Sequence, residues 1–205
     1  MKVTFKKILL KKKFPLAISR GVNSENYNVF IKIEDNGIVA WGESSPGETE
    51  GASNAEDVIS QINRLVEIGL ENKSIYEIES IAREMKISPC AYAGLDMALW
   101  DLKAKKAELK LHELLGLPLP SSMTSLTIGI MSPGSVKERI PLLLKDSSTK
   151  FLKVKLGSNI GLDADKAMYM QVLESSKKYD LKLRVDANGG WSTEEAKHMM
   201  EWLSN

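Results

Sequence analysis

Two lysines in one predicted strand are the residues of this chain best suited to acid–base chemistry. Lys153 and Lys155 stand two positions apart in the predicted strand 151–156, so alternation places both ammonium groups on the same face. Like charge and partial burial both favour the neutral form of a lysine, and a neutral lysine can act as a general base. The plainer interpretation is that these lysines form ordinary ion pairs with acidic residues elsewhere in the fold.

An aspartate ends the next predicted strand. Asp186 closes the strand 181–186 and is followed by Ala187-Asn188-Gly-Gly. A carboxylate that glycines leave open to approach suits a hard cation such as Mg²⁺. In barrel proteins, active sites lie at the carboxyl ends of the parallel strands. We therefore expect Asp186 to take part in chemistry at this edge of the sheet.

The strands that carry these residues alternate with helices in the second half of the chain. Each strand has one apolar and one polar face, as in Leu152, Val154 and Leu156 against the two lysines. A doubly wound sheet has helices on both faces and near-continuous apolar strands, whereas a (β/α)8 barrel has helices outside only. The pattern therefore favours a barrel whose interior carries chemistry. The predicted strands are 124–131, 151–156 and 181–186, and the predicted helices are 135–145, 163–178 and 193–203.

The first half of the chain has a different pattern. Up to about residue 45 apolar and polar residues alternate, and the turn Glu34-Asp35-Asn36-Gly37 predicts a hairpin in an antiparallel sheet. From Ser53 the apolar period becomes that of a helix. The run 116–122 is rich in Gly, Pro and Ser and marks a boundary. We therefore predict two domains, 1–120 and 121–205.

Several helix starts are signalled by capping boxes. In such a box a serine and a glutamate three residues later bond each other's backbone N–H groups. Ser88-Pro89 places a proline at the first position of another helix, and Pro141 must kink the helix 135–145 or delay its start. The predicted boxes are Ser53/Glu56, Ser74/Glu77, Ser135/Glu138 and Ser192/Glu195.

Composition narrows the class of protein. The 205 residues carry 28 Lys+Arg and 27 Asp+Glu, and a net charge of +1 gives no electrostatic reason to expect nucleic acid or an anionic membrane. No apolar run approaches the roughly 18 residues of a membrane span. The single cysteine, Cys90, cannot form an internal disulfide, so we predict a reducing, cytoplasmic location. We expect a small-molecule partner, with no nucleic acid and no membrane.

The strand-end residues and one helix together resemble a known family. Lys153-Val-Lys155, followed by Asp186-Ala-Asn188 at the next strand end, resembles the enolase superfamily, in particular its mandelate racemase/muconate lactonizing enzymes. The helix Ala91-Tyr-Ala-Gly-Leu-Asp-Met-Ala-Leu-Trp resembles the other signature of that family. The resemblance implies an α+β capping domain followed by the first three βα units of an incomplete (β/α)8 TIM barrel. It also implies an isomerase that uses one divalent cation, Mg²⁺.

The same resemblance implies a role for each candidate residue. Lys155 would exchange the proton α to a substrate carboxylate, and Lys153 would assist it and contact that carboxylate. Asp186 would be the first of three metal ligands, and Asn188 and Thr127 would contact the substrate. The reaction would be an epimerisation or racemisation through an enediolate, whose negative charge a divalent cation stabilises.

Within the superfamily the chain most resembles dipeptide epimerases of the L-Ala-D/L-Glu type. The strand 126–130 and the loop Ile18-Ser19-Arg20-Gly21 carry this likeness. Arg20 would bind a distal carboxylate of a dipeptide through both of its fork nitrogens, although a surface arginine in a loop is an equally good interpretation. The segment 43–54 would be a second specificity loop. o-Succinylbenzoate synthases, muconate cycloisomerases and N-acylamino acid racemases share the lysine pair and stay open, and a homo-oligomer is compatible with all of them.

The length of the chain departs from this pattern. About 85 residues follow Pro120, whereas a (β/α)8 barrel protein takes roughly 250. The metal carboxylates expected on the next two strands, and the opposing lysine beyond them, are not among these residues. We therefore expect an N-terminal fragment or a truncated reading frame that is inactive alone. The rival interpretation is a non-catalytic, truncated homologue that acts as a binding protein.

Overall fold

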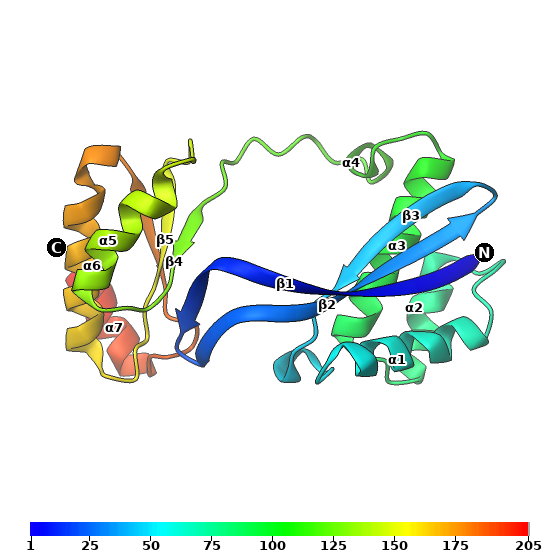
Figure 1. Ribbon diagram of the computed structural model, residues 1–205, viewed down its shortest axis with the longest axis horizontal. Coiled ribbons are helices and arrows are strands. Elements are labelled where there is room, and N and C mark those ends of the chain that lie inside the picture. Colours follow the sequence, from blue (N-terminus) through cyan, green and yellow to red (C-terminus); the bar gives the residue numbers. More distant parts are fainter. Residues whose placement is uncertain (205) are drawn as a thin grey trace. The chain divides into compact units, whose positions relative to one another are not determined.

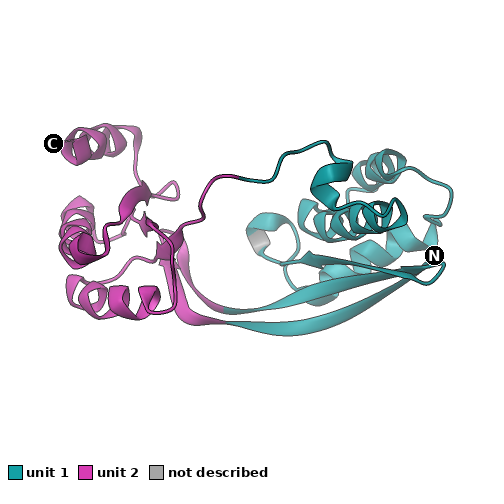
Figure 2. Cartoon of the chain, turned by 90° about the horizontal axis from the view of Figure 1, so that it is seen from above, with its two compact units in different colours: residues 1–11, 25–120 teal, residues 12–24, 121–205 magenta. Residues whose placement is uncertain are grey.

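The chain folds into two compact units. The computed structural model describes residues 1–204, apart from the side chain of Glu48. One unit comprises Met1–Lys11 with Glu25–Pro120, and the other comprises Lys12–Ser24 with the chain from Ser121 onward (Figure 2). Within the described part of the chain, no helix combines the length and the apolar character needed to cross a bilayer.

An antiparallel sheet begins the chain, with its strands in the order β1-β2-β3 (Figure 1). The predicted hairpin turn is confirmed at Asn36 and Gly37, whose φ angles of 48° and 80° are left-handed values that Asn and Gly adopt readily. Val29, Ile31 and Ile33 are fully buried. They form the apolar face that alternation predicts. The strands are β1 (Lys2–Ile18), β2 (Gly21–Asp35) and β3 (Ile38–Ser44).

Helices pack against the apolar face of this sheet. Ser74 and Glu77 form the predicted capping box of α2, and Ser88 caps α3 with Pro89 in its first turn. The predicted start of α1 is wrong by one residue, because Asn54 rather than Ser53 caps the helix. The helices are α1 (Ala55–Glu67), α2 (Ile75–Glu84) and α3 (Pro89–Lys106), with the short η1 (Glu48–Glu50) before them and α4 (Leu111–Leu114) after them.

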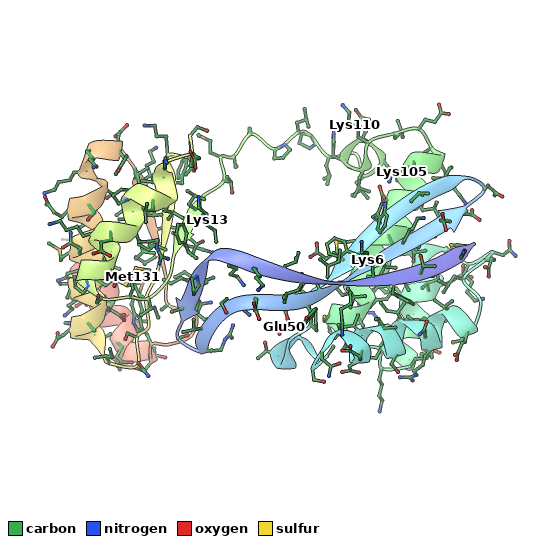
Figure 3. The ribbon with its side chains drawn as sticks, in the orientation of Figure 1. Lys6, Lys13, Glu50, Lys105, Lys110 and Met131 are labelled. Carbon is green, nitrogen blue, oxygen red and sulfur yellow. The ribbon has the colours of Figure 1, made fainter. Side chains whose placement is uncertain are left out.

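Helix α3 lies directly against strand β3. A Cβ added to Gly42 of β3 would lie 1.9 Å from the carbonyl oxygen of Gly94 on α3, so only glycine allows these backbones to come so close. Figure 3 labels Lys105, which lies near the end of α3. Its Nζ atom donates a hydrogen bond to the Val39 carbonyl at 3.0 Å. The first unit is therefore an α+β layer pair with a core of its own.

A parallel sheet in the order β4-β5-β6 organises the second unit. The helices α5, α6 and α7 lie on one side of this sheet (Figure 1). There Leu152, Val154 and Leu156 are fully buried in a core that includes Val136 and Met168, so the predicted apolar face is confirmed. The strands are β4 (Leu126–Ile128), β5 (Phe151–Lys155) and β6 (Lys182–Asp186), and the helices are α5 (Pro133–Leu144), α6 (Leu162–Ser176) and α7 (Thr193–Ser204), with η2 (Lys177–Tyr179) after α6.

The order of these elements is that of the first three βα units of a barrel, following an α+β cap, as the sequence predicts. The box Ser192/Glu195 is confirmed by its two reciprocal bonds. The box Ser135/Glu138 is wrong, because α5 starts earlier, at Pro133, with Ser132 as its N-cap. A capping serine followed by proline is the stronger start signal, because the first helical position needs no N–H donor and proline has none. Pro141 lies inside α5 and does not delay its start.

Candidate active site

Lys155 places a buried ammonium group at the carboxyl end of β5. The residue is only 7% exposed. Its Nζ atom donates a hydrogen bond to Oδ2 of Asp186, 2.7 Å away. A buried charge needs such a partner, because an unpaired ion loses its hydration without compensation. The β5–β6 register produces this pairing directly, since it sets Lys155 opposite Asp186.

Lys153 joins the same carboxylate. Its Nζ atom lies 3.7 Å from Oδ2 of Asp186, and its side chain is more exposed than that of Lys155. Two ammonium groups therefore share one carboxylate oxygen. The structure thus brings together the three charged residues that the sequence predicts at this edge of the sheet.

The Asp186 carboxyl has a pKa below its ordinary value. The largest cause is the hydrogen bond from Lys155. The backbone N–H of Asn188, which donates to Oδ1 at 3.0 Å, and the charge of Lys153 act in the same direction. Asp186 is therefore ionised at neutral pH, as a cation ligand must be.

A tight turn follows Asp186. The N–H of Gly190 donates to the Ala187 carbonyl at 2.8 Å. The two central residues, Asn188 and Gly189, have φ angles of 50° and 70°, which are typical of a type I′ turn. The side-chain Oδ1 of Asn188 is buried and has no hydrogen-bond partner among the described residues. An unsatisfied buried oxygen lacks a donor or a cation that a bound group could supply.

The structure places the two remaining candidates differently. Thr127 stands opposite Lys153 in the β4–β5 register, so it lies on the lysine face of the sheet, half-buried. Arg20 occupies the turn between β1 and β2 and is exposed. Its neighbour Ser19 donates through Oγ to the carbonyl of Asn188 at 3.1 Å. Ser19 therefore links this turn to the site, although the sequence predicts only Arg20 of this loop as a site residue, and Arg20 stays outside the charged cluster.

Sequence reasoning also missed a buried carboxylate near the cluster. Asp165 on α6 is 1% exposed and accepts hydrogen bonds from Gly157, Ser158 and Trp191. A signal for it existed, because Asp165 falls on the same helical stripe as the buried Met168. A charge on an apolar stripe must have polar partners inside the protein.

Two side chains at the site carry oxygen atoms of the kind that divalent cations bind. Asp186 offers a carboxylate and Asn188 an unpartnered oxygen, and oxygen ligands are those that Mg²⁺ prefers. Within residues 1–204 no group of three or more His, Cys, Asp or Glu could hold a metal ion. The donors therefore fit Mg²⁺ in kind, and a complete site needs further oxygen ligands.

Cys90, in the first unit, is unsuited to thiolate chemistry. Its thiol donates to the Ser45 carbonyl at 3.2 Å, and burial raises its pKa, so the unreactive protonated form persists at neutral pH. It borders a hollow of about 530 Å³ that Thr49 and Gly51 help to line. This hollow adjoins the segment 43–54, which the sequence predicts as a specificity loop.

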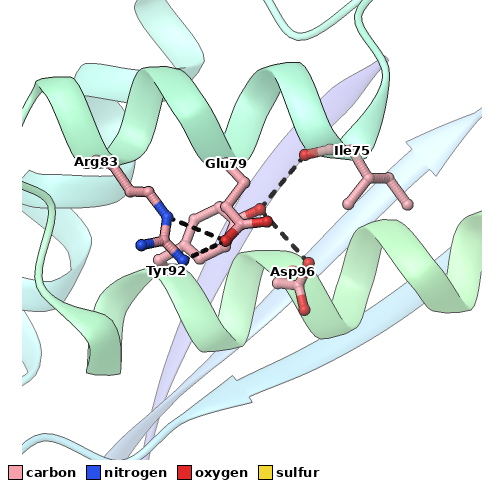
Figure 4. Close-up of polar contacts among 5 residues, drawn as sticks. All are labelled: Ile75, Glu79, Arg83, Tyr92 and Asp96. Carbon is pink, nitrogen blue, oxygen red and sulfur yellow. Dashed lines mark hydrogen bonds and ion pairs between the residues drawn. The ribbon is translucent and has the colours of Figure 1, made fainter.

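A carboxyl whose pKa is shifted in the opposite direction to that of Asp186 lies in the first unit. Burial raises the pKa of Asp96 on α3, and the charge of Glu79 acts in the same direction. The Tyr92 hydroxyl lies 3.5 Å from Asp96 Oδ1 and equally far from the Ile75 carbonyl (Figure 4). Arg83 pairs with Glu79 rather than with Asp96. Asp96 therefore has a hydroxyl neighbour where Asp186 has two ammonium groups.

An α+β unit followed by three βα units, with lysines and an aspartate at the carboxyl ends of the parallel strands, is the arrangement of capped barrel enzymes. Residues 1–116 match the family described as mandelate racemase / muconate lactonizing enzyme, N-terminal domain. The chain belongs to this family, which is part of the enolase superfamily.

Two curated relatives are similar over the whole chain. A hydrophobic dipeptide epimerase from Flavobacteria bacterium (strain MS024-2A) is 54% identical over 205 residues, and one from Roseobacter litoralis is 46% identical over 204 residues. The chain spans 59% of the length of each. A solved dipeptide epimerase from Cytophaga hutchinsonii, complexed with Mg and the dipeptide D-Ala-L-Val, matches with a TM-score of 0.87 and 26% identity, covering 98% of this chain and 55% of that one.

Proposed function

We propose that this chain supplies the cap, one catalytic base and the first metal ligand of a Mg²⁺-dependent dipeptide epimerase. The observation that carries the proposal is the cluster of Lys155, Lys153 and Asp186 at the strand ends. It stands in a family whose relatives at 54% and 46% identity are hydrophobic dipeptide epimerases. A buried lysine, a carboxylate and an unpartnered amide oxygen are groups that α-proton exchange beside a carboxylate can use.

Lys155 would move the proton. Its Nζ atom is buried at the end of β5, and Asp186 Oδ2 at 2.7 Å fixes its position. In the neutral form it would take the α proton from one face of the substrate carbon and return it to that face. Lys153 would bind the substrate carboxylate, for which its more exposed side chain is available. Mg²⁺, bound by Asp186 and by ligands outside this chain, would stabilise the charge that remains on the substrate.

We propose a hydrophobic dipeptide as the substrate, rather than L-Ala-L-Glu. The names of the two relatives support this choice. A hydrophobic dipeptide has no distal carboxylate, so it gives Arg20 nothing to bind, and Arg20 lies exposed in its turn. Thr127 and Asn188 remain proposed substrate contacts, because one shares the face of the lysines and the other has an unpartnered oxygen.

Other predictions accompany this proposal. The two compact units of the structure support the proposed division into domains 1–120 and 121–205. Residues 12–24 are the exception, because they belong to the second unit. The cytoplasmic location predicted from Cys90 and the homo-oligomer stay predictions. So does the expectation that the 205-residue chain is inactive alone.

The test is an exchange assay on the protein as its gene encodes it. L-Ala-L-Leu and L-Ala-L-Glu are incubated in D2O with Mg²⁺, and the Cα–H signal of the C-terminal residue is followed by NMR. We expect loss of this signal and formation of the L,D diastereomer for L-Ala-L-Leu, and EDTA should stop both. Turnover of a succinylated cyclohexene carboxylate alone would indicate an o-succinylbenzoate synthase. Inertness towards all these substrates would indicate a non-catalytic homologue.

A further inference from the structure

Asp165 is a buried carboxylate that the proposed proton transfer does not use. It lies in the first turn of α6 and accepts hydrogen bonds from three uncharged N–H groups. Carboxylates are almost never fully buried unless their oxygens have such partners, and the N-terminal end of a helix favours their charge. The donors are the backbone N–H of Gly157, 2.9 Å from Oδ2, the backbone N–H of Ser158, 3.0 Å from Oδ1, and the indole N–H of Trp191, 2.7 Å from Oδ2.

These donors belong to the two loops that follow β5 and β6, the strands that carry the two lysines and Asp186. The two backbone donors, Gly157 and Ser158, lie two and three residues after Lys155, which ends β5, and Trp191 follows the turn after Asp186. The N–H of Leu156 donates to the Asp186 carbonyl at 3.0 Å, one step beyond the β5–β6 register. Past that bond, the carboxylate of Asp165 bridges the two loops.

The backbones of the two loops also touch each other. Gly157 has a φ of +84°, and a Cβ there would lie 2.5 Å from the Ala187 carbonyl oxygen. A Cβ on Gly190 would lie 2.7 Å from the Gly157 carbonyl oxygen. Such a close approach needs glycine, and glycine contributes no side chain that could bond the two loops together. The hydrogen bonds to Asp165 connect the loops instead.

Trp191 adjoins the turn that orients Asp186. Gly190, its neighbour, closes this turn, and the N–H of Asn188 within the turn donates to Asp186 Oδ1 at 3.0 Å. A displacement of Trp191 therefore displaces the turn. The position of this turn fixes the orientation of the Asp186 carboxylate, to which Lys155 donates a hydrogen bond at 2.7 Å.

We infer that Asp165 is a positioning residue for the proton-transfer site. Its carboxylate fastens the loop after β5 to the loop after β6 and so sets the geometry of Lys155 and Asp186. This inference rests on the proposed function. Residues that orient metal ligands without touching the metal change affinity or activity by about 10–100-fold when replaced. If Asp165 had a structural role alone, its replacement would lower stability and leave the Mg²⁺ affinity and kcat of the folded molecules unchanged.

Asp165→Asn tests the inference in the protein as its gene encodes it. The substitution keeps the size of the side chain and replaces one acceptor oxygen with a donor that faces other donors. We expect kcat for Cα exchange to fall and the Kd for Mg²⁺ to rise, each by about 10–100-fold, with a smaller change in KM. Asp163→Asn is the matched control, because Asp163 is exposed in the same first turn of α6. It should behave as the wild type.

Trp191→Phe keeps an aromatic ring, although a smaller one, and removes the indole donor. We expect changes in the same direction as for Asp165→Asn, of about tenfold. Amide hydrogen exchange supplies a measurement that needs no turnover. In both variants the N–H of Asn188 and that of Gly190 should exchange faster than in the wild type, although neither group bonds Asp165.

Unchanged Mg²⁺ affinity, kcat and amide exchange in folded Asp165→Asn would make Asp165 a structural group and overturn the inference. If that variant does not fold, the same results in Trp191→Phe have the same force. Failure of the proposed function looks different, because the wild type itself then exchanges no dipeptide proton. That outcome removes the catalytic role, whereas the amide exchange of Asn188 and Gly190 still decides whether Asp165 holds the turn.

Discussion

Two aspartates, one in each unit, have pKa values shifted in opposite directions. Asp96 lies on the packed helix α3, where burial raises its pKa and a tyrosine hydroxyl is its polar neighbour (Figure 4). Asp186 lies at a strand end, where two lysines and a backbone N–H lower its pKa. Burial without a cation favours the neutral acid, whereas a cluster of cations keeps the carboxylate charged. Only the second environment prepares a group for binding a metal ion.

The same contrast extends to the two units. In the first unit glycines let α3 pack closely against β3, and Ser74 and Ser88 cap α2 and α3. In the second unit the helices cover the apolar strand face, and charged residues occupy the other face. We therefore expect substitutions in the first unit to change mainly stability, and substitutions at the strand ends of the second unit to change mainly chemistry.

The largest effect should follow Lys155→Ala. Removal of the proposed base should lower the rate of dipeptide epimerisation by about 1,000-fold or more, as measured by chiral chromatography of the product. Lys182→Ala is the control, because Lys182 is an exposed lysine at the opposite end of β6, on the same polar face. Its rate should stay close to that of the wild type. Equal rates in the two variants would contradict the proposal that chemistry takes place at the carboxyl ends of these strands and not at the opposite end.

A large effect on stability alone is expected for Gly42→Ala. The new Cβ would collide with the Gly94 carbonyl of α3, so the free energy of unfolding should fall by about 1–3 kcal/mol or more. Gly134→Ala, in the first turn of α5, meets no atom within 4 Å and serves as the control. Urea unfolding measures both. A Gly42→Ala protein as stable as the control would contradict the close packing of α3 on β3.

Asp96→Asn and Asp186→Asn should change stability in opposite directions at pH 7. The folded pKa of Asp96 is raised, so its charged form opposes folding, and Asn removes that penalty. The folded pKa of Asp186 is lowered, so its charge favours folding above the unfolded value of about 3.9, and Asn removes that gain. Urea unfolding from pH 7 downward should show both differences shrinking as the aspartates become protonated. Changes of the same sign would contradict the contrast between the two environments.

The smallest effect is expected for Arg20→Ala. Because Arg20 is exposed in its turn, kcat/KM for L-Ala-L-Leu should stay within about twofold of the wild type. Any residual activity towards L-Ala-L-Glu should fall further, since the arginine could pair with its distal carboxylate. An equal loss with both dipeptides would show instead that Arg20 acts on the shared dipeptide backbone.

Much of the fold could be predicted because the periodicity of the sequence is strong. Alternation located the buried face of β5, and the turn residues located the hairpin at Asn36 and Gly37. Helix starts were less secure, because several hydroxyl and amide side chains compete within a few residues, as Ser53 and Asn54 do before α1. Because these local signals are of nearly equal strength, tertiary packing decides which residue becomes the N-cap.

The candidate site could be predicted only in part. The spacing of Lys153, Lys155 and Asp186 along strands fixes their faces, and parallel register then brings them together. The buried Asp165 and the Ser19 hydroxyl join segments far apart in the chain. No local pattern encodes those contacts, although a charge on the apolar stripe of α6 was a visible sign of the first.

The most direct measurement of the central claim is solvent deuterium exchange by Lys155→Ala. The two diastereomers of L-Ala-Leu are incubated separately in D2O with Mg²⁺, and deuterium at Cα of the leucine is measured by mass spectrometry. If Lys155 serves one face of the substrate carbon and a base outside this chain serves the other, exchange should persist in one diastereomer only, with no interconversion. Epimerisation at the wild-type rate, with exchange into both diastereomers, would make Lys155 a structural charge paired with Asp186.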